Sequence, residues 1–122
     1  MGFDTATRGL RPEVVYNYKR EGPTQLAGTS AVKVYYNDTE GIQRFNLWLV
    51  NVGAAEALVN VHIVTHGGTA GATNKLFADV PLSGKETLVP PEMITLEGGD
   101  EVWIKSDTAT AVNYMLAIIY ET

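Results

Sequence analysis

The chain has 122 residues and a mass of 13.2 kDa, which fits a single domain with its own core. It contains no cysteine, and this excludes a disulfide scaffold, a zinc ribbon, an iron–sulfur cluster and a thiol nucleophile. Nine basic and 14 acidic residues give a net charge of −5, the opposite sign to that of a typical nucleic-acid binder. No apolar run is long enough for a transmembrane helix, so no membrane partner is expected.

Residues 1–30 differ from the rest of the chain. Pro12 and Pro23 bracket one short β-like run and forbid a long helix, so we expect an extended N-terminal arm with one short strand. Such an arm is stabilised more by packing on a neighbouring protein than by packing on its own domain. The arm side chains expected to contact a partner are Arg8, Arg11, Val14, Val15, Tyr16, Tyr18, Lys19 and Arg20.

From residue 31 to residue 122, strand-like runs alternate with polar turns. The runs are rich in β-branched and aromatic residues and lie at 31–36, 42–52, 58–66, 74–80, 86–89, 94–96, 101–105 and 110–120. No window keeps apolar residues at helical spacing without a glycine or proline break. The sequence therefore predicts an all-β domain, an antiparallel β-sandwich or jelly roll of about eight strands.

Two of the runs are apolar on both faces, although a strand with one solvated face should alternate apolar and polar residues. In the run 42–52, Phe45 and Leu47 share one face while Trp48 and Val50 share the other. Something should cover the second face: the arm, a loop or another subunit. The residues expected at a subunit interface are Trp48, Val50, Trp103, Met115 and Ile119.

Neither histidine predicts a metal site. His62 and His66 lie on one strand face but roughly 13 Å apart, too far for one ion to bridge. The glycine-rich loop at 67–71 lacks the lysine and the helix of a phosphate cradle. The sequon at Asn37 is more simply explained as a turn.

Acidic and hydroxyl side chains do not form a catalytic pattern either. Each serine lies in a turn, and none lies in a nucleophile elbow. The acidic residues expected to serve turns and solubility are Asp38, Glu40, Glu97, Asp100, Glu101 and Asp107. We therefore expect no enzyme, no catalytic residue, no cofactor and no metal.

The order of features along residues 26–121 is distinctive. A turn at 51–55 ends a strand, a Gly/Thr/Ala loop spans 67–73, and a polar linker spans 81–88. The stretch 94–104 follows an "apolar-x-Leu-x-x-Gly-Asp-x-Val" pattern, and an apolar strand ends the chain. This order resembles that of small β-sandwich virion proteins of tailed bacteriophages, which decorate capsids or belong to tails and fibres.

The resemblance implies a non-enzymatic virion structural protein, assembled in the host cytoplasm. Because the long arm suits a protein that clamps capsid subunits, we expect a capsid decoration or cement protein, acting as a trimer on the major capsid protein or another virion protein. A tail, neck or fibre subunit is the alternative. A carbohydrate-binding module with Trp48 or Trp103 as its platform is a further alternative.

Overall fold

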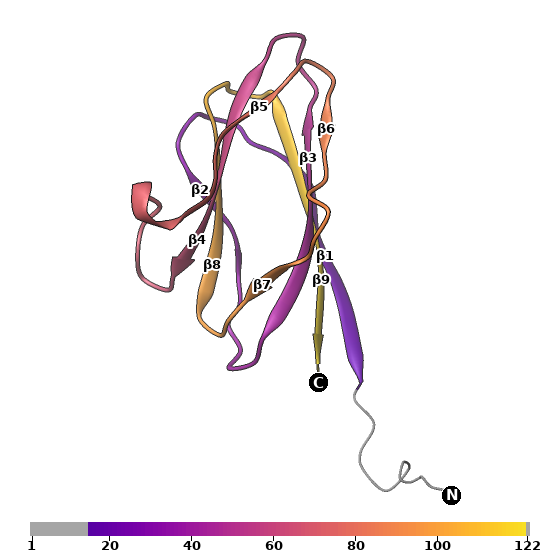
Figure 1. Ribbon diagram of the computed structural model, residues 1–122, viewed down its shortest axis with the longest axis vertical. Helices are drawn as coiled ribbons and strands as arrows, with labels where there is room; N and C mark the ends of the chain where they lie inside the picture. The colour runs from indigo at the N-terminus through magenta and orange to yellow at the C-terminus, as the bar shows by residue number, and fades with distance from the viewer. Residues whose placement is uncertain (1–14, 122) are drawn as a thin grey trace, which may run out of the picture.

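A computed structural model describes residues 15–121 as two antiparallel sheets packed face to face (Figure 1). The five-strand sheet has the order β1-β9-β3-β6, with β7 also paired to β3; its strands are β1 (Tyr16–Gln25), β3 (Gln43–Asn51), β6 (Thr87–Leu88), β7 (Ile94–Leu96) and β9 (Val112–Glu121). The four-strand sheet has the order β2-β8-β4-β5; its strands are β2 (Val32–Tyr36), β4 (Ala57–Thr65), β5 (Lys75–Leu82) and β8 (Asp100–Ser106). The predicted β-sandwich is confirmed, with nine strands where the sequence predicted about eight.

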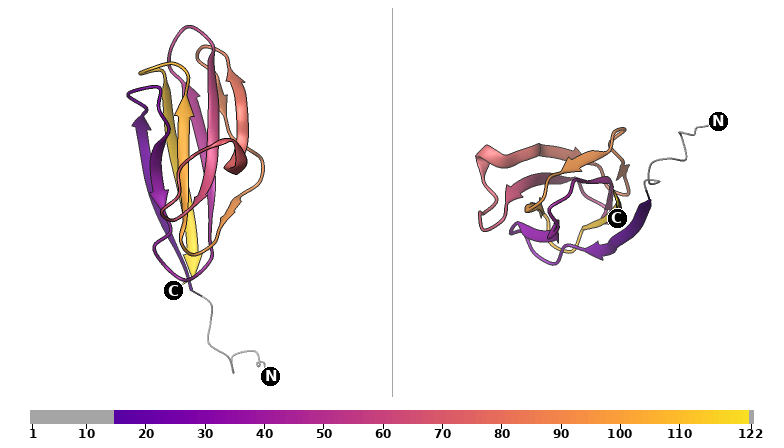
Figure 2. Two further views of the ribbon diagram at one scale, coloured as in Figure 1. Left: turned by 90° about the vertical axis from the view of Figure 1, so that its left-hand side faces the viewer. Right: turned by 90° about the horizontal axis from the view of Figure 1, so that it is seen from below.

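The core side chains lie between the two sheets. The end-on view shows the two layers of the sandwich (Figure 2, right). On β3 the alternation is strict, because Phe45, Leu47 and Leu49 are at most 1% exposed while Trp48 and Val50 are only half-buried. On β9 the inward set includes Leu116 and Ile118. Of the two apolar faces that the sequence predicts, the one with Phe45 is therefore the core.

The N-terminal segment differs from the expected arm. Residues 16–25 form a ten-residue strand through Pro23, paired with β9 from Tyr16↔Glu121 to Gln25↔Asn113. Leu26, which follows, is 3% exposed in the core. The ladder tolerates Pro23 because β1 is an edge strand and its register shifts between Glu21 and Thr24. The expectation that this part lies on a neighbour instead of its own domain is therefore wrong, while Arg8, Arg11 and Val14 lie outside the described residues.

Two turns at opposite ends of β3 share one hydrogen-bonding pattern. Asn37 and Asn51 are both 0% exposed. The Asn37 amide donates to the carbonyl of Gly41, four residues on, and the Asn51 amide donates likewise to that of Ala55. Each Asn oxygen accepts the backbone N–H two residues on. The predicted turn at Asn37 is confirmed, and its sequon amide is buried.

The turn after β7 packs tightly on the Asn37 turn, at Gly98. A Cβ added to Gly98 would lie 2.6 Å from the Thr39 carbonyl oxygen and 3.0 Å from the Glu40 Cα, and both are backbone atoms that cannot rotate away. We expect Gly98→Ala to lower the free energy of unfolding by about 1–3 kcal/mol, the usual cost of overpacking. Gly71→Ala is the matched control, because a Cβ there meets nothing within 4 Å. Urea denaturation of both variants tests this; equal midpoints would contradict the close contact.

Candidate subunit interface

The outward side of the five-strand sheet is not covered by any described segment. We call it the outer face of the five-strand sheet; its side chains come from alternate positions of three strands and are Tyr16, Tyr18, Arg20, Arg44, Asn46, Trp48, Val50, Asn113, Met115, Ala117 and Ile119. All are half-buried or exposed, and Tyr18 is 75% exposed. This face combines large apolar and aromatic side chains with two arginines, the composition that is enriched at protein interfaces.

Cross-strand register brings the predicted interface residues together. Trp48 lies directly opposite Met115, and Ile119 lies between Arg44 and Tyr18. Val50 is two residues beyond Trp48 on the same side of β3. Trp103 does not join them, because it lies on β8 in the other sheet. Four of the five predicted residues therefore form one continuous surface, and the fifth belongs to the opposite side of the molecule.

The described arm residues divide between the two sides of β1. Tyr16, Tyr18 and Arg20 extend the outer face, since their partners Glu121, Ile119 and Ala117 point outward on β9. Lys19 points the other way, and its ammonium lies 4.9 Å from the centre of the Tyr35 ring and 5.4 Å from that of Tyr120. A hydrogen bond with Tyr35 raises the pKa of Lys19, although partial burial lowers it. Lys19 therefore has intramolecular contacts, and its contact with a partner stays a prediction.

The outward side of the four-strand sheet carries a buried carboxylate that the sequence did not single out. Glu101 is 2% exposed; its oxygens accept a hydrogen bond from Trp103 Nε1 at 2.8 Å and pair with His66 Nδ1 at 2.7 Å. Lys33 Nζ lies 3.7 Å away. Burial raises the pKa of Glu101, but the Trp103 and His66 hydrogen bonds and the Lys33 charge together lower it below its usual range. The expectation that Glu101 is a solvated turn residue is wrong.

The two histidines hold the β4–β5 connection against this side. His66 stacks on Tyr36, with ring centres 4.4 Å apart, and bonds to Glu101. His62 is 3% exposed, and its Nδ1 lies 2.8 Å from Asn74 Oδ1, in the 3₁₀ turn Ala72–Asn74. His62 is therefore covered by its own chain. No set of three metal-ligating side chains gathers within residues 15–121.

His66 and Glu101 resemble the base and orienting acid of a catalytic triad, but no nucleophile completes them within residues 15–121. Among the described residues, no serine or threonine hydroxyl is hydrogen-bonded to His66. Ser106 is fully buried, and its hydroxyl donates to the Thr108 carbonyl. The pair joins β8 to the loop after β4. No helix in the described part of the chain is long and apolar enough to span a membrane.

Comparison with known proteins defines a fold class. No protein-family model matches the chain, and no curated protein matches its sequence. A solved structure from work on Bacillus endospore appendages, described as a family of disulfide-linked pili, is similar with a TM-score of 0.57 and 17% identity over 88% of each chain. At this identity the likeness concerns the fold, and the chain is an all-β sandwich protein.

Proposed function

We propose that the protein is a non-enzymatic structural subunit of a bacteriophage particle, a capsid decoration protein that associates as a trimer. The observation that supports this proposal is the outer face of the five-strand sheet. Within the described residues, no segment covers this sheet face, which carries Trp48, Met115, Ile119 and two tyrosines. Apolar surface exposed to water is costly, and burial against other copies removes that cost. Trp, Tyr and Arg are also the residues that dominate binding energy at interfaces.

A tail, neck or fibre subunit would use the same face in a ring of different symmetry. The similarity to an endospore appendage protein supports a second candidate, a subunit of a pilus-like filament. The 122 residues contain no cysteine, so in either case they could not be linked by disulfides. In a closed trimer the rotation that relates neighbouring subunits returns to the first subunit after three steps, whereas in a filament it never does. Electron microscopy of concentrated protein distinguishes the two assemblies.

The solution mass of the purified full-length chain, measured by light scattering over a range of concentrations, tests the proposal. We expect a trimer. Trp48→Glu or Met115→Glu should raise the protein concentration at which half of the trimer dissociates by more than tenfold, because each substitution places a charge in the centre of the buried face. Leu76→Glu is the matched control, since Leu76 is 44% exposed on β5 in the other sheet. Near-ultraviolet circular dichroism confirms that the variants fold.

A monomer at every concentration would overturn self-association, and filaments would favour the pilus-like candidate. The arm is tested separately by deleting residues 1–14. A longer deletion, to residue 20, would remove half of β1 and with it five of the eight residue pairs of the ladder to β9.

A further inference from the structure

Basic and aromatic side chains share the outward side of the four-strand sheet, and one of them, the buried His62, is covered by the turn Ala72–Asn74. The register places Lys33 opposite Trp103, Trp103 opposite His62, and His62 opposite Lys75, on four adjacent strands. Lys105 follows Trp103 on the same side of β8. Three of the chain's five lysines therefore surround one tryptophan in an acidic protein.

Trp103 is held in place as a platform. Its indole N–H donates to Glu101, which is itself fixed by His66. The indole is half-buried and not part of the core cluster, so a portion of its surface is open to solvent. The neighbouring Tyr36 ring offers no second platform, because His66 covers it in a stacked arrangement.

Three acidic side chains on this side have hydrogen-bond partners within the protein, and they keep their negative charge. Glu101 is buried, Asp79 Oδ1 accepts a hydrogen bond from the Asn60 amide, and Asp107 Oδ1 accepts one from the Leu58 backbone N–H. Among the described residues, neither Lys75 nor Lys105 has a carboxylate within 4 Å. Both side chains are exposed, although the charge of Lys105 also lowers the pKa of Asp107. Lys33 already pairs with Glu101 at 3.7 Å, so Lys75 and Lys105 are the main candidates to pair with a ligand.

We propose that this surface, defined by Trp103, Lys33, Lys75 and Lys105, binds an acidic oligosaccharide. The apolar C–H face of a pyranose ring packs on the indole, and the lysines pair with carboxylates of flanking sugars. The backbones of β2 and β5 lie three strand spacings apart, roughly 14 Å. This span is longer than one pyranose ring, so a chain of sugars matches the surface better than a single sugar.

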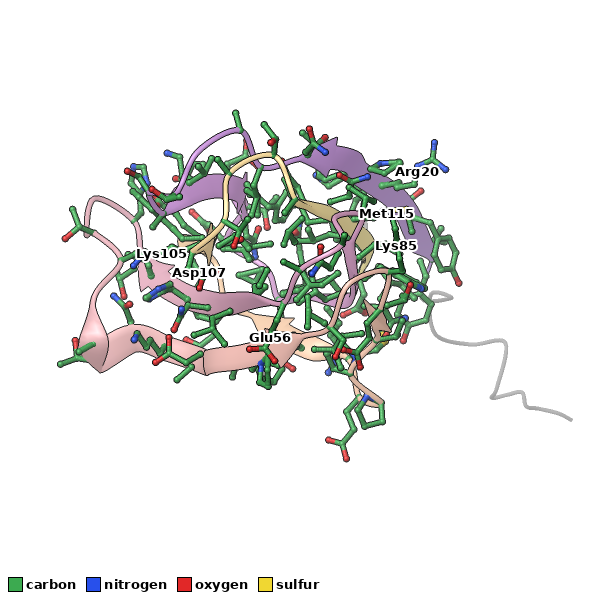
Figure 3. All side chains as sticks on the ribbon, turned by 90° about the horizontal axis from the view of Figure 1, so that it is seen from above. Arg20, Glu56, Lys85, Lys105, Asp107 and Met115 are labelled. Atoms are coloured by element: carbon green, nitrogen blue, oxygen red, sulfur yellow. The ribbon has the colours of Figure 1, made fainter. Side chains whose placement is uncertain are left out.

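A nucleic acid fits this surface less well. Single-stranded nucleic acids bind through successive aromatic platforms in a strongly positive groove, whereas this surface has one platform and the chain has a net charge of −5. The surface is also independent of the proposed subunit interface. Figure 3 shows Lys105 on one side of the sandwich and Met115 and Arg20 on the other.

Tryptophan fluorescence and calorimetric titration of the full-length chain with trigalacturonate test the proposal. Trp48→Phe leaves Trp103 as the only tryptophan, so its emission reports the site. We expect saturable binding that shifts this emission. The double variant Lys75→Gln/Lys105→Gln should weaken binding about tenfold, from the loss of two screened ion pairs.

Arg44→Gln is the matched control, because it removes one positive charge from the outer face of the five-strand sheet and should leave binding unchanged. Absence of binding at millimolar trigalacturonate would overturn the proposal. So would equal binding of maltotriose that does not depend on the lysines, since the ligand would then be a neutral sugar. Equal or tighter binding of a thymidine hexanucleotide would assign the surface to nucleic acid instead.

Discussion

Replacing Asn37 by alanine should lower the free energy of unfolding by about 2–4 kcal/mol, and replacing Asn51 should have a similar effect. The Asn37 amide nitrogen lies 2.9 Å from the Gly41 carbonyl oxygen, 3.1 Å from that of Glu97 and 3.3 Å from that of Leu96. Its oxygen accepts from the Thr39 backbone N–H and hydroxyl. Alanine leaves these groups without partners at a buried site, where each unsatisfied group costs about 1–3 kcal/mol.

The Asn51 amide has the same role at the other end of β3. It donates to the carbonyls of Ala55 at 2.8 Å and Leu82 at 2.9 Å, and its oxygen accepts from the Gly53 N–H. Each asparagine therefore ties its own turn to a distant segment, the turn after β7 in one case and the end of β5 in the other. Because the two sites share no partner, the effects of the two substitutions should add within about 0.5 kcal/mol.

Chemical denaturation of the two single variants and the double variant measures these effects. Asn46→Ala is the control, since Asn46 is half-buried on the outer face of the five-strand sheet and should change stability by less than about 1 kcal/mol. Asn37→Asp sharpens the test, because it keeps the acceptor for Thr39 but places a carboxylate against three carbonyl oxygens. If the aspartate variant were as stable as the wild type, donation by the Asn37 amide would not matter.

The alternation of residue types along β3 and β9 was enough to predict that these segments are strands and which side chains share a face. Period-two patterning placed Phe45, Leu47 and Leu49 on one face, and the register of the sheet made that face the core. The same patterning could not predict that β1 continues through Pro23. A strand tolerates proline only at the edge of a sheet, and which strand lies at the edge depends on how all the strands pair.

Buried polar residues were the main source of error. Asn37 and Asn51 were correctly predicted in turns, but their burial depends on carbonyls that lie 59 and 31 residues away in the sequence. Glu101 follows a turn, which in the sequence indicates a solvated side chain. Its partners His66 and Lys33 come from segments far away in the sequence, next to β4 and in β2. Only the pairing of β8 with both β2 and β4 brings these groups together. The grouping of Trp48, Val50, Met115 and Ile119, in contrast, followed from the apolar pattern of two adjacent strands.

The Glu101 cluster predicts how stability depends on pH. The hydrogen bonds from Trp103 and His66 and the charge of Lys33 outweigh burial and lower the folded-state pKa of Glu101. The folded protein therefore binds this proton less tightly than the unfolded chain. The stabilisation from the ionised carboxylate is complete above the usual glutamate pKa, about 4.3, and is lost as the pH falls through the lowered folded-state pKa.

Glu101→Gln isolates this contribution, because glutamine has nearly the shape of the protonated acid. At pH 7 the variant should be less stable than the wild type by about 1–3 kcal/mol, since hydrogen bonds and an ion pair to a charged acceptor are lost. As the pH falls below the folded-state pKa of Glu101, the two proteins should converge, because the wild-type side chain is then also neutral.

Urea denaturation of both proteins at intervals from pH 7 to pH 2 measures the difference directly. Asp107 also has a lowered pKa, through the Leu58 backbone N–H, and it titrates in both proteins, so its contribution cancels in the difference. Glu40→Gln serves as the control for loss of one negative charge, since Glu40 lies on an exposed turn and should contribute little. A gap between wild type and Glu101→Gln that stays constant down to pH 2 would mean that shape, and not the ionised carboxylate, holds His66, Trp103 and Lys33 together.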